Sequence, residues 1–274
     1  MELKRTNHLS YLANCFNKDR ESLFFLHGFP DNYYVWKELT PYLIENYNIV
    51  CACAPHCSND SFLDEQVKIK NFRLNNLTSS YLEIININNL ENAGLTLIAH
   101  DMGGPYAHKL LEYLNDSVKL ICLNTLSGQA LVKRKSNPEQ LLRSSYMTLF
   151  QLPFITKKTL FKFWYFLREN AQILGRSDKN LIPSEYDSHI LNGLNFYKAL
   201  LLDTPTFLKK KKWENRVLFV WSLQDPFLVR PTEKELGGYY KEISFKTISA
   251  GHWPMLDEPK ELAQIIDDFL QRDL

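Results

Sequence analysis

Short apolar runs recur along most of the chain, separated by longer stretches in which apolar residues return with helical spacing. The runs are rich in Val, Ile, Leu and Phe and show no polar alternation, which is typical of strands buried on both faces of a sheet. Six strands are predicted on this basis: Ser22–Leu26, Tyr47–Cys53, Leu95–Ala99, Val118–Leu123, Val217–Trp221 and Phe245–Ile248.

Amphipathic helices are predicted between these strands, at Tyr33–Glu45, Tyr106–Leu114 and Lys260–Leu270. Strand and helix in alternation indicate an α/β fold with a mostly parallel sheet. The alternation stops between residues 127 and 205, where helical periodicity continues without a clear strand. We therefore expect residues 1–126 and 206–274 to form the sheet core. Residues 127–205 would be a helical insertion over the sheet edge at which ligands bind in open α/β folds.

Composition narrows the possible partners. The chain has 274 residues, of which 45% are hydrophobic, so it has material for a sizeable core. Lys and Arg number 32 and Asp and Glu 31, so the chain lacks the basic excess of a nucleic-acid binder. A small, uncharged ligand is more compatible with this balance. No apolar run is long enough to span a membrane or to serve as a signal peptide, so we expect a cytoplasmic protein.

The cysteines give no sign of a metal site. Cys51, Cys53 and Cys57 cluster around His56, but their spacing is not C-x-x-C and no second half follows downstream. Reduced thiols are the default in a cytosolic chain of this length. We expect no metal and no cofactor.

A nucleophile turn is predicted where His100-Asp101-Met102-Gly103-Gly104 follows the strand Leu95–Ala99. Ala99 and Gly103 lie two positions to either side of Asp101, which is the spacing of a nucleophile elbow with Asp in place of Ser. Small residues are needed there because the turn is tight, and the helix N-terminus behind it stabilises an anion. The alternative is that Asp101 merely caps the helix. The motif alone does not separate the two interpretations.

Two residues further along the chain favour the catalytic interpretation. Asp225 follows the strand Val217–Trp221, and His252 follows the strand Phe245–Ile248. Taken separately, the first could be an Asp-Pro turn and the second a solvated loop histidine. Nucleophile, acid and histidine in this order, each after its own strand, predict a triad of Asp101 as nucleophile, Asp225 as the acid that orients the imidazole, and His252 as general base.

An oxyanion hole is predicted beside this triad. The strand Ser22–Leu26 runs into His27-Gly28-Phe29-Pro30, and Gly28 permits close approach of the backbone. The N–H groups of Phe29 and Met102 would then point at the reacting oxygen. An ordinary strand-to-helix turn containing Gly and Pro is the alternative.

With these motifs, the chain resembles α/β-hydrolase-fold epoxide hydrolases from about Glu21 to its end. The resemblance is carried by residues 27–30 and 99–104, by Asp225 and by Gly251-His252. It implies the α/β-hydrolase fold, a mostly parallel sheet flanked by helices, with residues 127–205 as a helical cap. Residues 144–153 and 194–198 resemble the cap segments that hold the family's two epoxide-activating tyrosines, which would be Tyr146 and Tyr197 here.

The resemblance also implies a reaction. Asp101 would attack a ring carbon of an apolar epoxide and form an alkyl-enzyme ester, while Tyr146 and Tyr197 donate to the departing oxygen. His252 would then activate the water that hydrolyses the ester to a vicinal diol. The expected partners are thus a small apolar substrate and water, with the chain acting as a monomer or homodimer. Apolar side chains expected to line the substrate pocket are Phe150, Phe154, Trp164, Phe196, Trp253 and Met255.

Two alternatives remain open. Haloalkane dehalogenases resemble the chain in the triad, but they hold the halide with a Trp directly after the nucleophile, where this chain has Met102, and they often carry Asn where Phe29 stands. A non-catalytic ligand-binding protein that uses a hydrolase cavity is the other alternative. It has no need of a nucleophile, an acid, a histidine and two cap tyrosines together.

Overall fold

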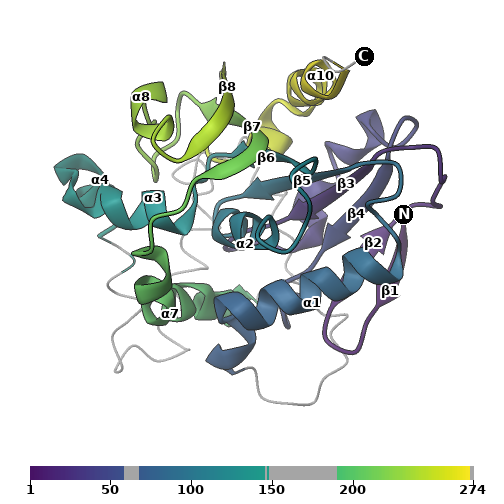
Figure 1. The fold of residues 1–274 in the computed structure, drawn as a ribbon, viewed down its shortest axis with the longest axis horizontal. Coiled ribbons are helices and arrows are strands. Elements are labelled where there is room, and N and C mark those ends of the chain that lie inside the picture. Colours follow the sequence, from purple (N-terminus) through teal and green to yellow (C-terminus); the bar gives the residue numbers. More distant parts are fainter. Residues whose placement is uncertain (59–67, 146, 148–189, 272–274) are drawn as a thin grey trace.

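A twisted sheet runs through the middle of the molecule (Figure 1). In the computed structural model, which describes residues 1–58, 68–145, 147 and 190–271, the strand order is β1-β2-β4-β3-β5-β6-β7-β8. β1 and β2 are antiparallel to their neighbours, and the strands from β4 to β8 pair in parallel. The strands are β1 (Glu2–Arg5), β2 (Ser10–Ala13), β3 (Ser22–Leu26), β4 (Asn48–Ala52), β5 (Leu95–His100), β6 (Lys119–Leu123), β7 (Trp213–Ser222) and β8 (Tyr240–Ile248).

The six predicted strands are β3 to β8, and the predicted α/β fold is confirmed. Every residue of β3, β4 and β5 is buried, which explains why these strands read as continuous apolar runs. The sequence pattern did not indicate β1 and β2. Both have only four residues, and β1 is mostly exposed at the sheet edge, so neither carries an apolar run.

The helices around the sheet differ from the predictions in their bounds. Around the sheet lie α1 (Leu74–Ile87), α2 (Gly103–Leu110), α8 (Glu233–Leu236), α9 (Pro254–Asp257) and α10 (Pro259–Leu270). α1 packs beside α2, and α2 packs on β5 (Figure 1). The predicted helix Tyr33–Glu45 is wrong: two 3₁₀ turns, Tyr33–Trp36 and Thr40–Tyr42, occupy this stretch. Pro41 has no N–H to donate, so a continuous α-helical ladder cannot run through it.

Among the described residues between β6 and β7, the α-helices are α3 (Gly128–Lys133), α4 (Pro138–Arg143) and α7 (Ile190–Phe207). α3 packs against α7, with the Phe207 ring directly against Gly128. α7 is tied to the core through Asp203, whose carboxylate accepts from Arg73 Nε and from the Leu74 N–H, each at 2.7 Å. The helical insertion predicted for residues 127–205 includes residues 148–189, which lie outside the described residues. Its bounds stay a prediction.

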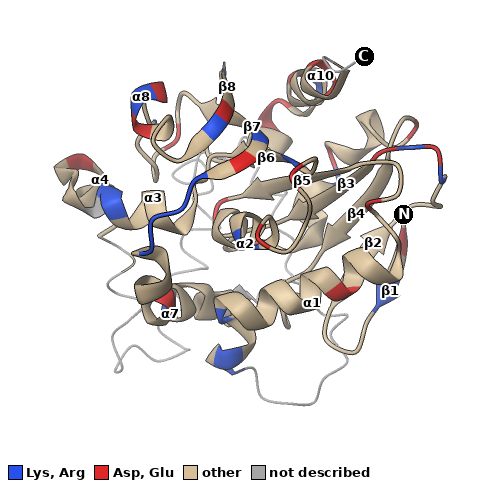
Figure 2. Cartoon of the chain, viewed as in Figure 1, with Lys and Arg blue, Asp and Glu red and all other residues tan. Residues whose placement is uncertain are grey.

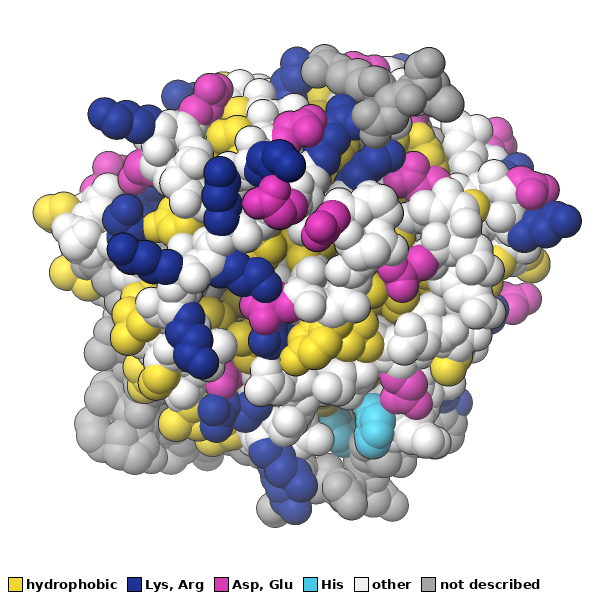
Figure 3. Space-filling model, viewed as in Figure 1, with side chains coloured by type: hydrophobic (Ala, Val, Ile, Leu, Met, Phe, Trp, Pro, Cys, Tyr) yellow, Lys and Arg dark blue, Asp and Glu magenta, His cyan; other side chains and the backbone are white. Residues whose placement is uncertain are grey.

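Charge is distributed evenly over the face shown in Figure 3, where basic, acidic and apolar side chains are interspersed. The longest basic run is the connector of lysines at 209–212 between α7 and β7 (Figure 2). Within the described residues, no helix has the length and hydropathy that a membrane span requires. The same part of the chain holds no group of three His, Cys, Asp or Glu side chains placed to bind a metal ion.

Candidate active site

Asp101 occupies a strained turn between β5 and α2. Its φ is +48°, in the left-handed region that non-glycine residues rarely adopt. A Cβ at Gly103 would collide with the carbonyl oxygen of Leu26, so only glycine fits two places after Asp101. The interpretation of Asp101 as a helix cap is wrong, because the N-cap of α2 is Met102 and no side chain caps this helix.

The structure brings Asp101, Asp225 and His252 together from the ends of three strands. His252 Nδ1 lies 2.7 Å from Asp225 Oδ2, and His252 Nε2 lies 3.5 Å from Asp101 Oδ2. The side chains of His252 and Asp225 are almost fully buried, at 3% and 1% exposed, whereas that of Asp101 is 15% exposed. The buried carboxylate therefore orients the imidazole, and the more accessible one faces the cavity described below.

The charged forms of Asp101, Asp225 and His252 stabilise one another. Burial opposes the charged form of all three side chains. For His252, the charge of Asp225 and hydrogen bonds to both carboxylates outweigh burial and raise its pKa. For Asp101 and Asp225, burial is likewise outweighed, chiefly by His252, and the pKa of each carboxyl is lowered. These shifts favour an imidazolium between two carboxylates at neutral pH.

The backbone after β3 holds the other oxygen of Asp101. The Phe29 N–H donates to Asp101 Oδ1 at 2.9 Å. A Cβ on Gly28 would lie 2.6 Å from the Met102 nitrogen and would collide with Asp101 Oδ1. Only glycine at position 28 therefore lets the turn after β3 lie this close to Asp101 and Met102. The two carboxylate oxygens are therefore distinct: Oδ1 faces the backbone N–H of Phe29, and Oδ2 faces His252.

His27 holds the turn of residues 27–30 through two hydrogen bonds of its imidazole. Its Nε2 accepts from the Ala54 N–H at 2.9 Å, so Nδ1 carries the proton and donates to the carbonyl of Gly28 at 2.7 Å. Burial lowers the pKa of His27, which favours this neutral form. Pro30 continues the turn through a cis peptide bond with Phe29. The predicted motif of residues 27–30 is thus one hydrogen-bonded unit beside Asp101.

Two further residues hold the group in place, and the sequence reasoning missed both. Asn124 follows β6, and its Nδ2 donates to Asp225 Oδ2 at 2.5 Å while its Oδ1 accepts from Ser222. His100 Nε2 lies 2.8 Å from the backbone oxygen of His252. Burial and the neighbouring His252 charge lower the pKa of His100 to about 4, so it stays neutral. Asn124 could have been found by the rule that singled out Asp225, a polar side chain directly after a buried strand.

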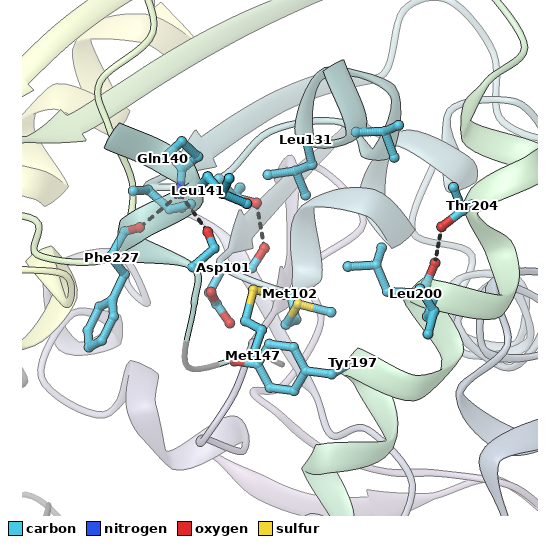
Figure 4. Close-up of a pocket in the computed structure, with 15 residues that line it drawn as sticks. Asp101, Met102, Leu131, Gln140, Leu141, Met147, Tyr197, Leu200, Thr204 and Phe227 are labelled. Atoms are coloured by element: carbon cyan, nitrogen blue, oxygen red, sulfur yellow. Dashed lines mark hydrogen bonds between the residues drawn. The ribbon is translucent and has the colours of Figure 1, made fainter. Parts of the chain in front are cut away.

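A cavity of about 430 Å³ opens in front of Asp101 (Figure 4). Tyr197 of α7 lines it together with Asp101 and Met102, and the Tyr197 ring packs edge-on against Phe29 at a centroid distance of 5.3 Å. Apart from Asp101, the described lining carries no charge. The other described lining residues are Thr125, Leu131, Val132, Gln140, Leu141, Ser144, Met147, Leu200, Leu201, Thr204, Phe227 and Leu228.

Among the described residues, the structure places none of the expected pocket residues at this cavity, and the predicted donor Tyr146 is not described. Tyr146, Phe150, Phe154 and Trp164 lie outside the described residues. Phe196, Trp253 and Met255 are described, but they are not among the residues found to line this cavity, and each is at most 1% exposed.

Helix geometry explains the position of Phe196. One residue is about 100° of turn on a helix, so Phe196 points away from Tyr197. It packs into the core against Phe72, at a centroid distance of 4.9 Å. Trp253 is held differently, by a hydrogen bond of 2.7 Å from its Nε1 to Asp31.

Comparisons with known proteins identify the family of the chain. A family model described as alpha/beta hydrolase fold matches residues 21–259. An AB hydrolase superfamily protein, YfhM, of Bacillus subtilis is 28% identical over 95% of this chain and 94% of its own length. Epoxide hydrolase 3 of Xenopus tropicalis is 26% identical over 94% of this chain and 73% of its own length.

Solved structures share the fold at lower identity. An epoxide hydrolase from Bacillus megaterium, crystallised with an inhibitor, superposes with a TM-score of 0.80 at 19% identity, over 99% of this chain and all of its own. A putative acyltransferase from Salmonella enterica superposes with a TM-score of 0.81 at 16% identity, over 99% of this chain and 95% of its own. Likeness of fold therefore does not distinguish one reaction from another.

Proposed function

The chain belongs to the alpha/beta hydrolase fold family, and on that premise we propose that it is an epoxide hydrolase that opens an apolar epoxide to a vicinal diol. One observation carries the proposal. A carboxylate stands at the nucleophile turn and lines a largely apolar cavity, with one of its oxygens on the Phe29 N–H and the other facing His252. The relatives named as epoxide hydrolases support it.

The first step is displacement by a carboxylate. Asp101 Oδ2 attacks a ring carbon, a new C–O bond forms, and the epoxide C–O bond breaks with its electron pair going to the oxygen. Tyr197 gives its hydroxyl proton to that oxygen across the cavity. Tyr146, the second cap tyrosine that the resemblance implies, would donate a hydrogen bond to the same oxygen. A serine at this turn is suited to acyl transfer rather than to displacement at an alkyl carbon. The aspartate therefore directs the reaction to displacement at an alkyl carbon, and Tyr197 favours an epoxide over a halide because a departing oxygen needs a proton donor.

Ester formation prepares the second step electrostatically. The ester has no charge, so His252 loses one of the two carboxylates that raise its pKa. Burial then favours the neutral imidazole, and the proton it loses restores Tyr197. The neutral Nε2 can now accept a proton from water.

Hydrolysis regenerates the starting state. The water oxygen adds to the ester carbon as its proton passes to His252, and Asp225 stabilises the imidazolium that forms. Negative charge develops on Asp101 Oδ1, where the N–H groups of Phe29 and Met102 stabilise it. The ester bond breaks, the departing alkoxide takes the proton of the new carboxyl, and the diol leaves. Asp101 is again a carboxylate and His252 again an imidazolium.

A side-by-side substrate panel tests the proposal. Styrene oxide and an aliphatic 1,2-epoxide are incubated with the protein and analysed for diol, and 1-bromobutane is analysed for released bromide. We expect diol from at least one epoxide, no bromide, and loss of the activity in Asp101→Asn but not in Asp116→Asn, an exposed aspartate on the surface.

Other outcomes overturn the proposal in distinct ways. Bromide release without diol assigns the site to a dehalogenase. Absence of turnover across a varied set of epoxides and halides assigns it to ligand binding without catalysis.

A further inference from the structure

The loop after β7 holds the imidazole in two ways. Asp225 Oδ2 binds His252 Nδ1, while Oδ1 accepts from the N–H groups of Phe227 at 2.7 Å and Leu228 at 3.0 Å. The Phe227 ring meets the imidazole edge-on at a centroid distance of 5.1 Å. Because the carboxylate is hydrogen-bonded to the backbone of its own loop, a shift of residues 225–229 would move both groups that contact the imidazole.

Side chains from outside the loop hold its backbone. Gln140 of α4 pairs with two of its residues: Nε2 donates to the carbonyl of Phe227 at 3.0 Å, and Oε1 accepts from the Val229 N–H at 2.9 Å. Arg143 Nη1 donates to the carbonyl of Asp225 at 2.6 Å, and Arg134 Nη2 donates to the carbonyl of Val229 at 2.7 Å. Of these three, only Gln140 is uncharged and also lines the cavity.

The polar atoms of Gln140 are already engaged. Its amide nitrogen donates to Ser144 Oγ at 2.8 Å and to Phe227, and its oxygen accepts from Val229. An amide nitrogen has two protons, so no donor is left for a ligand. Gln140 is 6% exposed. The Gln140 amide therefore lies in the largely apolar cavity wall because it binds the loop 225–229, and not because it binds substrate.

We propose that Gln140 is a positioning residue, which fixes the loop 225–229 so that Asp225 and Phe227 hold His252 in place. The inference concerns the site to which the proposed function assigns catalysis, and its role in turnover rests on that function. It assigns to α4 a part in setting the basicity of His252.

The electrostatic surroundings of His252 make the inference testable. The groups that face its imidazole are Asp225 after β7, and Asp101 and the neutral His100 at the end of β5. Arg143 lies behind, on the Asp225 carbonyl. Replacing Gln140 changes no charge, so any shift in the pKa of His252 must come from geometry. With Asp225 less well placed, its charge stabilises the imidazolium less, and the pKa falls.

The test is a histidine titration by NMR in wild type and Gln140→Met, which needs no substrate. Gln129→Met is a matched control: Gln129 pairs in the same manner with Lys211, donating to its carbonyl at 3.3 Å and accepting from its N–H at 2.8 Å, but the connector it holds carries no site residue. We expect the pKa of His252 to fall by about one unit in Gln140→Met, a tenfold change in the proton equilibrium, and to stay unchanged in Gln129→Met.

Kinetics and a second variant complete the design. With a turned-over epoxide, Gln140→Met should change kcat and its pH profile while KM stays within about twofold. Should Gln140→Met fail to fold, Gln140→Asn replaces it, because the shorter amide cannot reach both Phe227 and Val229 and should lower the same pKa.

An unchanged pKa of His252 in a folded Gln140 variant overturns the inference, and a raised KM with an unchanged pKa identifies Gln140 as a substrate contact instead. A lowered pKa in a protein that turns over no epoxide leaves the positioning role standing and removes the proposed function.

Discussion

Neutralising Asp101 should lower the pKa of His252. The variant Asp101→Asn keeps the shape of the side chain but removes its charge, as ester formation would. In the wild type, burial lowers the pKa of His252, but Asp225 and Asp101 together raise it above the ordinary value of 6.5. With Asp101 neutral, one of these two contributions disappears while burial remains, so the sign of the change is downward.

The magnitude follows from the distance between the charges. His252 Nε2 and Asp101 Oδ2 are 3.5 Å apart. Two unit charges at that separation attract by about 5 kcal/mol at an effective dielectric constant of ~20, and by about 1 kcal/mol in bulk water. One pKa unit corresponds to ~1.4 kcal/mol. The side chain of Asp101 is partly exposed to the cavity, so the interaction lies between these limits, and we expect a fall of about one to three units.

The assay is an NMR titration of ¹⁵N-labelled histidines, with the His252 resonance assigned by its loss in His252→Gln. Asp257→Asn is the matched control, since Asp257 accepts from the Gly251 N–H at 2.8 Å next to His252 in the chain, whereas the imidazole nitrogens face Asp225 and Asp101. A pKa of His252 that is the same in Asp101→Asn and wild type would refute the reasoning, because the histidine would then not become a better base when the ester forms.

Three further substitutions test separate parts of the site. Gly28→Ala should lower kcat by about 10²–10³, the effect of losing an oxyanion donor, because the new methyl collides with Asp101; Gly238→Ala, where a Cβ makes only ordinary contacts, should leave kcat unchanged. Tyr197→Phe should lower epoxide turnover by about 10²–10⁴ with the thermal midpoint retained, since its ring packing on the cavity wall is preserved. Asp203→Ala should reduce the free energy of unfolding in urea by about 1–3 kcal/mol, because it leaves a buried backbone N–H at the start of α1 without an acceptor.

How far the sequence could predict the fold depended on the type of element. Strands buried on both faces, such as Leu95–His100, form apolar runs that are visible without a structure. The 3₁₀ turns at Tyr33–Trp36 and Thr40–Tyr42 were misread as one helix, because apolar spacing alone does not register the effect of Pro41. The apolar pattern could not predict β1, because its residues are held by pairing with β2 rather than by burial of apolar surface.

In the site, the sequence predicted residues that directly follow a strand, but it did not predict residues whose partners are distant in the chain. Asp101, Asp225 and His252 each follow a strand, and the structure brings them together. Gln140 binds a loop more than 80 residues away, and nothing in its own neighbourhood marks it. Phe196 was assigned to the pocket beside Tyr197, although consecutive helix positions face different directions and Phe196 faces the core.

Single-turnover hydrolysis in H₂¹⁸O tests most directly whether Asp101 forms the ester. The protein is mixed in excess over epoxide, and both the diol and the peptide that contains Asp101 are then weighed by mass spectrometry. Water that attacks the ester carbon leaves its oxygen on the enzyme, so we expect ¹⁸O in the Asp101 carboxylate and unlabelled diol from the first turnover. Labelled diol with an unlabelled Asp101 would show that water attacks the epoxide directly, and it would contradict the covalent mechanism.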